Sequence, residues 1–360
     1  MRVLIVTNLY PDARQPAFGT FVAAHAEALR RAGAEVEIVA ITGVPVHREV
    51  VRKYVSLTWR AIGAGLRARR RRPRTTVVEA HVAYPTALMG LIAARLAGAA
   101  LAVYSHGTDV TGIALRSRLH HAVARWLLGR ADLVVANSAF IGDLLEARYR
   151  VRPARVRVLS PGVDLSQYDG PPLDRAPKEI LFVGRLATQK GVHELLRAVA
   201  DLADGEVTLR FAGAGPERAR LEAASAEAGI HAIFDGPLPP ADVARLMRQA
   251  AVVAVPSTYP EGLGLVAIEA MAAGALTVAS AIGALGESVK QGDTGWLVPP
   301  GDVAALTQAL REALSMTSAS DITELTAIRQ RARAKATEHD IDAMARLTLA
   351  AYESVAGKAS

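Results

Sequence analysis

PSTYPEGLGLVAIEAMAAG, residues 256–274, is the most informative segment of this chain. It follows an apolar run, residues 251–255, that is typical of a buried strand, and it leads directly into a predicted helix. Two carboxylates, Glu261 and Glu269, therefore lie on one strand-to-helix segment. The first N–H groups of a helix have no intrahelical acceptor, so the backbone amides of residues 262–265 can stabilise an anion. The segment predicts a loop that holds a nucleoside diphosphate.

A second segment of the same kind begins at residue 178. Residues 178–183 form a predicted strand, followed by Gly184, Arg185 and Lys190 and then by an amphipathic helix through Ala200. Glycine at a strand end lets the backbone approach a ligand closely. An arginine and a lysine five positions apart can both reach one diphosphate, the arginine as a planar fork and the lysine as a point charge.

These two segments resemble glycosyltransferase family 4, through the paired glutamates Glu261 and Glu269 and the Gly-Arg-Leu…Lys-Gly pattern of residues 184–191. The motif His106-Gly-Thr-Asp109 also matches the family. The resemblance covers almost the whole chain and is most specific from residue 184 to residue 302. It implies an α/β fold of two facing Rossmann-like domains (GT-B), with a cleft between them and a C-terminal helix that returns to the first domain.

The resemblance also implies the roles of the site residues. Glu261 is expected to orient the donor sugar through its hydroxyls, Glu269 to bind the ribose hydroxyls and His106 to contact the sugar. Arg185 and Lys190 are expected to neutralise the departing phosphates. The predicted catalytic residues are thus Glu261, His106, Arg185 and Lys190, and the predicted donor-binding residues are Gly19, Gly184, Gly262, Leu263, Gly264, Leu265 and Glu269. No metal and no cofactor is expected, because the only Asp-x-Asp, at residues 340–342, begins the terminal helix.

The N-terminal half predicts an opening βαβ unit, with strands near residues 1–7 and 35–41 and a helix over residues 20–31. Gly19, within Ala-Phe-Gly-Thr-Phe, resembles the subgroup that builds cell-wall and exported polysaccharides. We predict an acceptor-side domain over residues 1–170 together with the helix of residues 340–360. A nucleotide-sugar-binding domain is predicted over residues 171–339, after a proline-rich connection.

Charge and hydropathy restrict where such a protein acts. The chain has 360 residues, no cysteine, a net charge of +7 and 51% hydrophobic residues. Its densest basic run contains Arg67, Arg69, Arg70, Arg71, Arg72 and Arg74, at the end of a helix predicted to begin near Ser56. Either a solvated helix end or docking to an anionic membrane accounts for this run. Nucleic acid is disfavoured, because only 5% of the residues are aromatic.

Two further features bear on localisation. Residues 86–103 are almost wholly apolar, but Arg95 and Gly98 interrupt them, so we predict a buried helix followed by a buried strand rather than a membrane span. The first residues lack the cleavage site of a signal peptide. We predict a cytoplasmic protein, and peripheral binding at the inner membrane leaflet stays open as the alternative to a fully solvated one.

The function predicted on this basis is a hexosyltransferase: a retaining, metal-independent transfer of a sugar from a UDP- or GDP-type donor to the hydroxyl of a glycan or lipid-linked acceptor. Two alternatives stay open, a non-hydrolysing sugar-nucleotide epimerase on the same fold and a non-catalytic nucleotide-sugar-binding protein. An NAD-dependent oxidoreductase is disfavoured, because the Gly213-Ala-Gly215 motif lacks the third glycine of a dinucleotide fingerprint.

Overall fold

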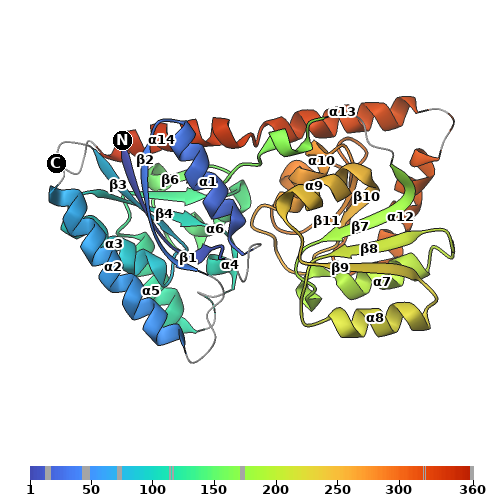
Figure 1. The fold of residues 1–360 in the computed structure, drawn as a ribbon, viewed down its shortest axis with the longest axis horizontal. Coiled ribbons are helices and arrows are strands. Elements are labelled where there is room, and N and C mark those ends of the chain that lie inside the picture. The colour runs from blue at the N-terminus through green and yellow to red at the C-terminus, as the bar shows by residue number, and fades with distance from the viewer. Residues whose placement is uncertain are drawn as a thin grey trace. The chain divides into compact units, whose positions relative to one another are not determined.

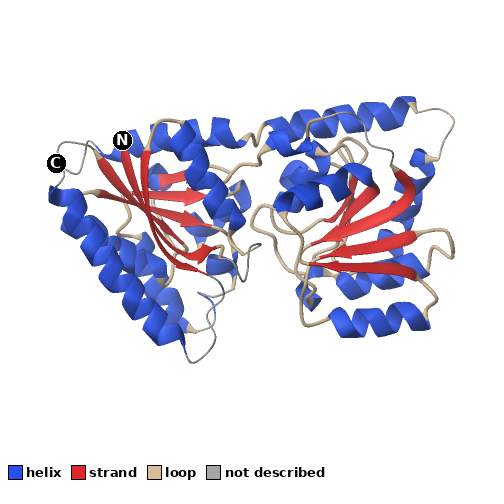
Figure 2. Cartoon of the chain, viewed as in Figure 1, coloured by secondary structure: helices blue, strands red, loops and turns tan. Residues whose placement is uncertain are grey.

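The computed structural model describes residues 1–12, 18–42, 49–70, 75–112, 115, 117–170, 175–318, 320 and 322–356. The chain forms two compact units, one of Met1–Gly162 together with the segment that begins at Ile341, and the other of Val163–Asp340. Each unit is a parallel sheet with helices on both faces, an α/β architecture (Figures 1 and 2). The division falls earlier than the predicted boundary after residue 170, because Tyr168 packs into the core of the second unit.

The first unit contains a six-stranded sheet in the order β2-β1-β3-β4-β5-β6. Its elements are β1 (Arg2–Tyr10), α1 (Thr20–Arg31), β2 (Glu35–Thr42), α2 (Val50–Arg70), β3 (Thr76–His81), α3 (Thr86–Ala97), β4 (Ala100–Ser105), α4 (Thr108–Thr111), α5 (Arg118–Leu128), β5 (Leu133–Ala136), α6 (Ala139–Ala147), the 3₁₀ turn η3 (Pro153–Arg155), β6 (Val156–Val158) and α14 (Ile341–Ala356).

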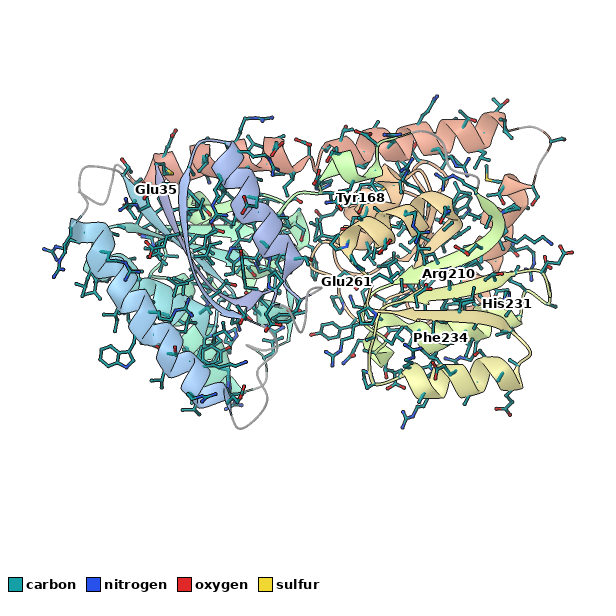
Figure 3. All side chains as sticks on the ribbon, in the orientation of Figure 1. Glu35, Tyr168, Arg210, His231, Phe234 and Glu261 are labelled. Atoms are coloured by element: carbon teal, nitrogen blue, oxygen red, sulfur yellow. The ribbon has the colours of Figure 1, made fainter. Side chains whose placement is uncertain are left out.

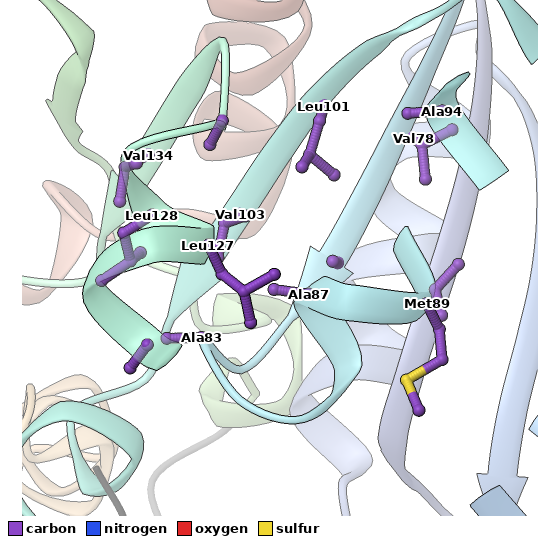
Figure 4. Packing of buried hydrophobic residues seen from close by; sticks show 14 of the residues in the cluster. Val78, Ala83, Ala87, Met89, Ala94, Leu101, Val103, Leu127, Leu128 and Val134 are labelled. Atoms are coloured by element: carbon purple, nitrogen blue, oxygen red, sulfur yellow. The ribbon is translucent and has the colours of Figure 1, made fainter. Parts of the chain in front are cut away.

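The core of the first unit lies on both faces of this sheet, which is why its central strands are almost continuously apolar. On one face, Val78, Leu101 and Val103 pack under side chains of the neighbouring helices, such as Met89 and Leu127 (Figure 4). On the other face, α1 and α14 cover the sheet. Tyr352 of α14 is fully buried there, which confirms that the C-terminal helix returns to the first unit.

The second unit also contains a six-stranded parallel sheet, in the order β12-β11-β10-β7-β8-β9. Its elements are η4 (Leu165–Tyr168), β7 (Ala176–Val183), η5 (Thr188–Lys190), α7 (Val192–Ala200), β8 (Thr208–Ala212), α8 (Arg218–Glu227), β9 (His231–Gly236), α9 (Pro240–Gln249), β10 (Ala250–Val255), α10 (Leu265–Ala272), β11 (Leu276–Ser280), α11 (Leu285–Ser288), β12 (Trp296–Val298), α12 (Val303–Thr317) and α13 (Thr323–Thr337). Helices α7, α8 and α12 pack on one face and α9, α10 and α11 on the other.

Two local predictions can be compared directly with the structure. The apolar stretch of residues 86–103 is the buried helix α3 followed by the buried strand β4, as predicted. The predicted start of α2 near Ser56 is wrong, since the helix begins at Val50. Glu49 pairs with Arg52 and Lys53 at distances of 3.5 Å, and these contacts support the first turn. Among the described residues, every helix is too short or too polar to cross a bilayer.

Candidate active site

Strands β7 and β10 are neighbours in the second sheet, so the loops that follow them meet at its carboxyl edge. The amide of Thr258 donates to the carbonyl of Gln189 over 3.0 Å. Gly191, with φ of +68°, lies so close to the other loop that a Cβ there would be 1.8 Å from the carbonyl oxygen of Pro256. Only glycine allows this approach, which joins the two segments that the sequence singled out.

Lys190 and Glu261 form the ion pair at the centre of this junction. Lys190 Nζ lies 2.5 Å from Glu261 Oε1 (Figure 3 labels Glu261). The hydroxyl of Ser257 donates to the same oxygen over 2.5 Å. The Glu261 carbonyl accepts a hydrogen bond of 2.9 Å from the amide of Ala284, which anchors the loop. Ser257 was not among the predicted site residues, although it lies in the same loop, four residues before Glu261.

The start of α10 provides the predicted anion site. Gly264 is the N-cap residue in the left-handed region, with φ of 78°, and the helix begins at Leu265. Gly264 lies in a crowded position, since a Cβ on this residue would lie 2.4 Å from the Leu285 side chain. With Gly262 and Leu263, these residues place the helix N-terminus directly after Glu261. Backbone N–H groups at this end can bind a phosphate.

Gly184 and Arg185 follow β7 on the side of β8. A Cβ on Gly213 would lie 1.9 Å from the Gly184 carbonyl oxygen, and one on Gly215 would lie 2.1 Å from that of Leu186. The two glycines after β8 therefore allow the β8 loop to pack on the β7 loop. Arg185 is exposed, and its guanidinium makes no ion pair with a described residue. The Arg185 side chain thus remains available for an anionic ligand.

Glu269 lies on α10, one turn after its start, in a very different environment from Glu261. Burial raises the pKa of Glu269 to about 7. Tyr168 lies near the Glu269 carboxylate. Burial raises the pKa of the Tyr168 phenol, and the negative charges of Glu269 and Asp164 raise it further. Without a ligand, Glu269 is therefore partly protonated at neutral pH, rather than fully ionised as its predicted role requires.

We expect Glu269 to make the stability of the free protein depend on pH. The folded-state pKa of about 7 exceeds the ordinary value of 4.5, so the stabilisation is complete below about pH 4.5 and is lost as the pH rises through 7. Above pH 7, this difference in pKa between the folded and unfolded states lowers the free energy of unfolding by about 3 kcal/mol. Glu269→Gln should abolish this part of the pH dependence, and the difference in unfolding free energy between wild type and variant, measured at pH 5 and pH 8 by urea titration, tests it. An unchanged difference at the two pH values would contradict the assignment.

His106, in the first unit, lies on the loop between β4 and α4. Asp109 is buried and holds this loop: it accepts hydrogen bonds from the amides of Ala83, His106 and Gly107 and from the Ser105 hydroxyl, over 2.8–3.2 Å. The Asn137 side chain donates to the His106 carbonyl over 3.1 Å. The motif around His106 therefore positions the imidazole through Asp109, a role that sequence reasoning had not assigned.

The start of α1 lies beside His106. The ring of Phe21 packs edge-on against that of His106, with centroids 4.8 Å apart. Gly19 is the N-cap residue of α1, with φ of 69°. A Cβ on Gly19 would lie 2.5 Å from the backbone of Leu9, so glycine is required for this loop to approach the end of β1. The structure thus brings Gly19 and His106 into one region of the first unit.

Comparison with solved structures defines the fold. Sucrose-phosphate synthase from Thermosynechococcus elongatus superimposes with a TM-score of 0.79 and 21% identity, over 99% of each chain. Anabaena Alr3699/HepE, crystallised with UDP, superimposes with a TM-score of 0.77 and 22% identity, over 98% of this chain and 100% of that one. The fold is that of the GT-B glycosyltransferases.

Sequence comparison then specifies the family. Residues 169–335 match the model described as "Glycosyl transferases group 1", and residues 18–167 match "Glycosyltransferase Family 4". A 2-deoxystreptamine glucosyltransferase of Streptomyces kanamyceticus is 33% identical over 75% of this chain and 75% of its own length. The chain belongs to glycosyltransferase family 4.

Other relatives match over a shorter region. Glycogen synthase of Mycobacterium tuberculosis is 36% identical over 55% of this chain and 49% of its own length. A D-inositol 3-phosphate glycosyltransferase of Rhodococcus jostii is 40% identical over 48% of this chain and 42% of its own length. The matched regions thus cover less than half of these two relatives.

Proposed function

We propose that this glycosyltransferase moves a hexose-type sugar from a UDP- or GDP-type donor to an acceptor hydroxyl, with retention at the anomeric carbon and without a metal ion. The observation that carries the proposal is the cluster of Lys190, Glu261 and Ser257 at the N-terminus of α10. It combines a cation, an oriented carboxylate and helix amides at one edge of the sheet. The binding of UDP and UDP-glucose by Anabaena Alr3699/HepE supports a donor of this class.

The proposed reaction exchanges two bonds at the anomeric carbon. The bond from that carbon to the donor diphosphate breaks, and a bond to the acceptor oxygen forms on the same face. The proton of the acceptor hydroxyl passes to the departing diphosphate oxygen. Lys190, Arg185 and the amides of residues 262–265 stabilise the charge on that diphosphate, where preorganised donors have the greatest effect on rate.

For the acceptor, we propose a hydroxyl of a glycan or a lipid-linked sugar. The relatives named above act on 2-deoxystreptamine, D-inositol 3-phosphate or glycogen, which all carry several hydroxyl groups. Glu261 would orient the transferred sugar, and Glu269 would bind the ribose of the donor in its ionised form. His106 would contact the sugar.

The experiment is a donor screen with product analysis. The protein is incubated with UDP- and GDP-hexoses and candidate glycan acceptors, with and without EDTA, and the anomeric configuration of the product is read by proton NMR. Transfer with retention that survives EDTA is the expected result. Isomerisation of the donor sugar without acceptor would identify an epimerase, and tight nucleotide binding without turnover a binding protein. Loss of transfer in EDTA that added divalent metal restores would contradict the mechanism.

We also propose that α2 docks on an anionic membrane surface. Val51, Val55, Trp59 and Leu66 are exposed and lie on one side of this helix, at the spacing of successive turns. Exposed Arg52, Arg69 and Arg70 flank the stripe, while Arg67 pairs with Glu37 over 2.6 Å. A basic helix with an apolar stripe that contains tryptophan is typical of helices that lie in the membrane interface. Arg71, Arg72 and Arg74 of the predicted basic run lie outside the described residues.

Trp59→Ser together with Arg69→Gln and Arg70→Gln should reduce cosedimentation with anionic vesicles by roughly 10-fold or more, because each basic residue contributes about 1 kcal/mol at such a surface. Vesicles of phosphatidylglycerol and phosphatidylcholine serve as the probe, and pure phosphatidylcholine as the neutral control. Arg118→Gln together with Arg125→Gln, both exposed on α5, provides a variant of equal charge loss at another site. Equal sedimentation of wild type with both vesicle types would leave the stripe as ordinary solvated surface.

A further inference from the structure

A line of buried polar side chains connects the interior of the first unit to His106. Glu79, fully buried on β3, has His25 of α1 and His81 on two sides: its Oε1 lies 3.0 Å from His25 Nε2 and 2.6 Å from His81 Nε2. The other ring nitrogen of His81, Nδ1, lies 2.8 Å from His106 Nε2, within hydrogen-bonding distance. Glu79, His81 and His106 therefore follow one another in contact.

The rings are also held in orientation by stacking. The imidazoles of His81 and His106 are nearly parallel, with 4° between their planes and 5.0 Å between their centroids. Tyr104, on β4, stacks on both of them, with planes within 5° and 9°. Its hydroxyl donates to the Leu159 carbonyl over 2.6 Å, which leaves little freedom for the stack to tilt.

The charge of Glu79 is retained in spite of its burial. Burial alone would raise the pKa of Glu79, but the adjacent imidazoles of His25 and His81, which are positive when protonated, outweigh it and hold that pKa well below its usual range. In contrast, burial lowers the pKa of His106 well below its usual value, and the charges of His81 and His25 add to this effect. An ionised acceptor thus lies at one end of the line and a neutral imidazole at the other.

The same cluster has the residue types of a metal site, since His25, Glu79 and His81 bring their ligand atoms within 4.8 Å of one another. However, both imidazole nitrogens pair directly with one carboxylate oxygen, and the 2.6 Å from His81 is shorter than the separation of two ligands on one ion. Ligands at about 2.0–2.1 Å from a tetrahedral zinc lie roughly 3.3 Å apart. The geometry favours charge pairing.

We propose that Glu79 and His81 are positioning residues that set the tautomer and ring orientation of His106. An ionised carboxylate only accepts, so His81 directs its Nε2–H at Glu79. When His81 carries this one proton, its Nδ1 accepts from Nε2–H of His106. As a result His106 presents an unprotonated Nδ1, an acceptor for a hydroxyl hydrogen of the donor sugar. This role rests on the proposed function, in which His106 contacts that sugar.

The comparison of His81→Gln with His25→Gln isolates this effect. Both variants replace an imidazole that faces the same oxygen of Glu79, but only His81 is hydrogen-bonded to His106. In His81→Gln, the amide side chain can reach toward the carboxylate, but it no longer offers a ring nitrogen to His106. His25 contacts His81 and Tyr104 through edge-on ring packing. His25→Gln is therefore the matched control for a lost ion-pair contact.

The readouts are ring ¹⁵N chemical shifts at pH 8 and steady-state kinetics. We expect wild-type His106 to carry its proton on Nε2, His81→Gln to show a mixture of tautomers and His25→Gln to keep the wild-type pattern. We also expect kcat to fall about 10-fold to 100-fold in His81→Gln, the usual cost of losing a partner that orients a site residue. His25→Gln should lower kcat much less.

Several results would overturn the proposal. One is a wild-type His106 that is protonated on Nδ1 at pH 8, a measurement that needs no variant to fold. Another is an equal tautomer change in both variants, which would indicate a general effect of the buried charge. Stoichiometric divalent metal in the purified protein, whose removal shifts the His25 and His81 signals, would identify a metal site. If His106→Ala keeps full activity, the proposed contact with the sugar fails, while the tautomer measurement still decides the role of Glu79 and His81.

Discussion

Lys190→Ala is expected to lower kcat by about 100-fold to 1,000-fold and to weaken binding of the free nucleoside diphosphate. One preorganised donor that faces developing charge contributes roughly 2.7–4 kcal/mol to the transition state. Here the donor is a cation, and its removal also leaves the partly buried Glu261 carboxylate with Ser257 but without its positive partner. Uncompensated negative charge would then repel the departing phosphates.

The measurement combines steady-state transfer rates with calorimetric titration of UDP and GDP. Lys178→Ala is the control, since Lys178 is a half-exposed lysine near the start of β7, the strand that precedes Lys190, and pairs with Asp204 and Glu206 over 2.8 and 2.7 Å. Arg185→Ala should weaken diphosphate binding too, without disturbing an ion pair of the described residues. Unchanged diphosphate affinity in both Lys190→Ala and Arg185→Ala would refute the phosphate-binding assignment.

Glu261→Gln is expected to reduce transfer by more than about 100-fold with little change in nucleotide affinity. The amide keeps the shape of the side chain but loses the charge that pairs with Lys190 and orients the sugar, an interaction needed in the transition state. Glu269→Gln should instead raise the dissociation constant of the donor about 10-fold to 100-fold, since a hydrogen bond to a charged group contributes about 1.5–3 kcal/mol.

Donor titrations alongside turnover separate the two glutamates. Because the free protein holds Glu269 with a pKa of about 7, donor affinity in wild type should also increase as the pH rises through that value. Glu269→Gln should lack this pH dependence, whereas Glu261→Gln should keep it. The reverse pattern, with Glu261 governing affinity and Glu269 governing only the rate, would mean that the two roles are exchanged.

Much of the local structure follows from short-range patterns. The apolar run that ends at Val255 is the buried strand β10, and Gly264 marks the start of α10, because strand burial and helix capping depend on neighbouring residues. The start of α2 was placed too late, because the ion pairs of Glu49 with Arg52 and Lys53 support a first turn that the hydrophobic pattern does not reveal. The motifs located Lys190, Glu261, His106 and Asp109, but they assigned no role to Asp109, Ser257 or Glu79.

The amino-acid sequence alone was enough to predict the alternation of strands and helices. It also predicted the two segments that carry charged residues at strand ends. Each of these features depends on residues within a few positions of each other. Tertiary structure decided the rest. Lys190 and Glu261 meet across 71 positions only because β7 lies next to β10 in the sheet. The packing of η4 against α10 helps to bury Glu269 and so to raise its pKa, and α1 brings His25 to the Glu79 carboxylate. Contacts of this kind arise from packing over long sequence separations, which local patterns do not encode.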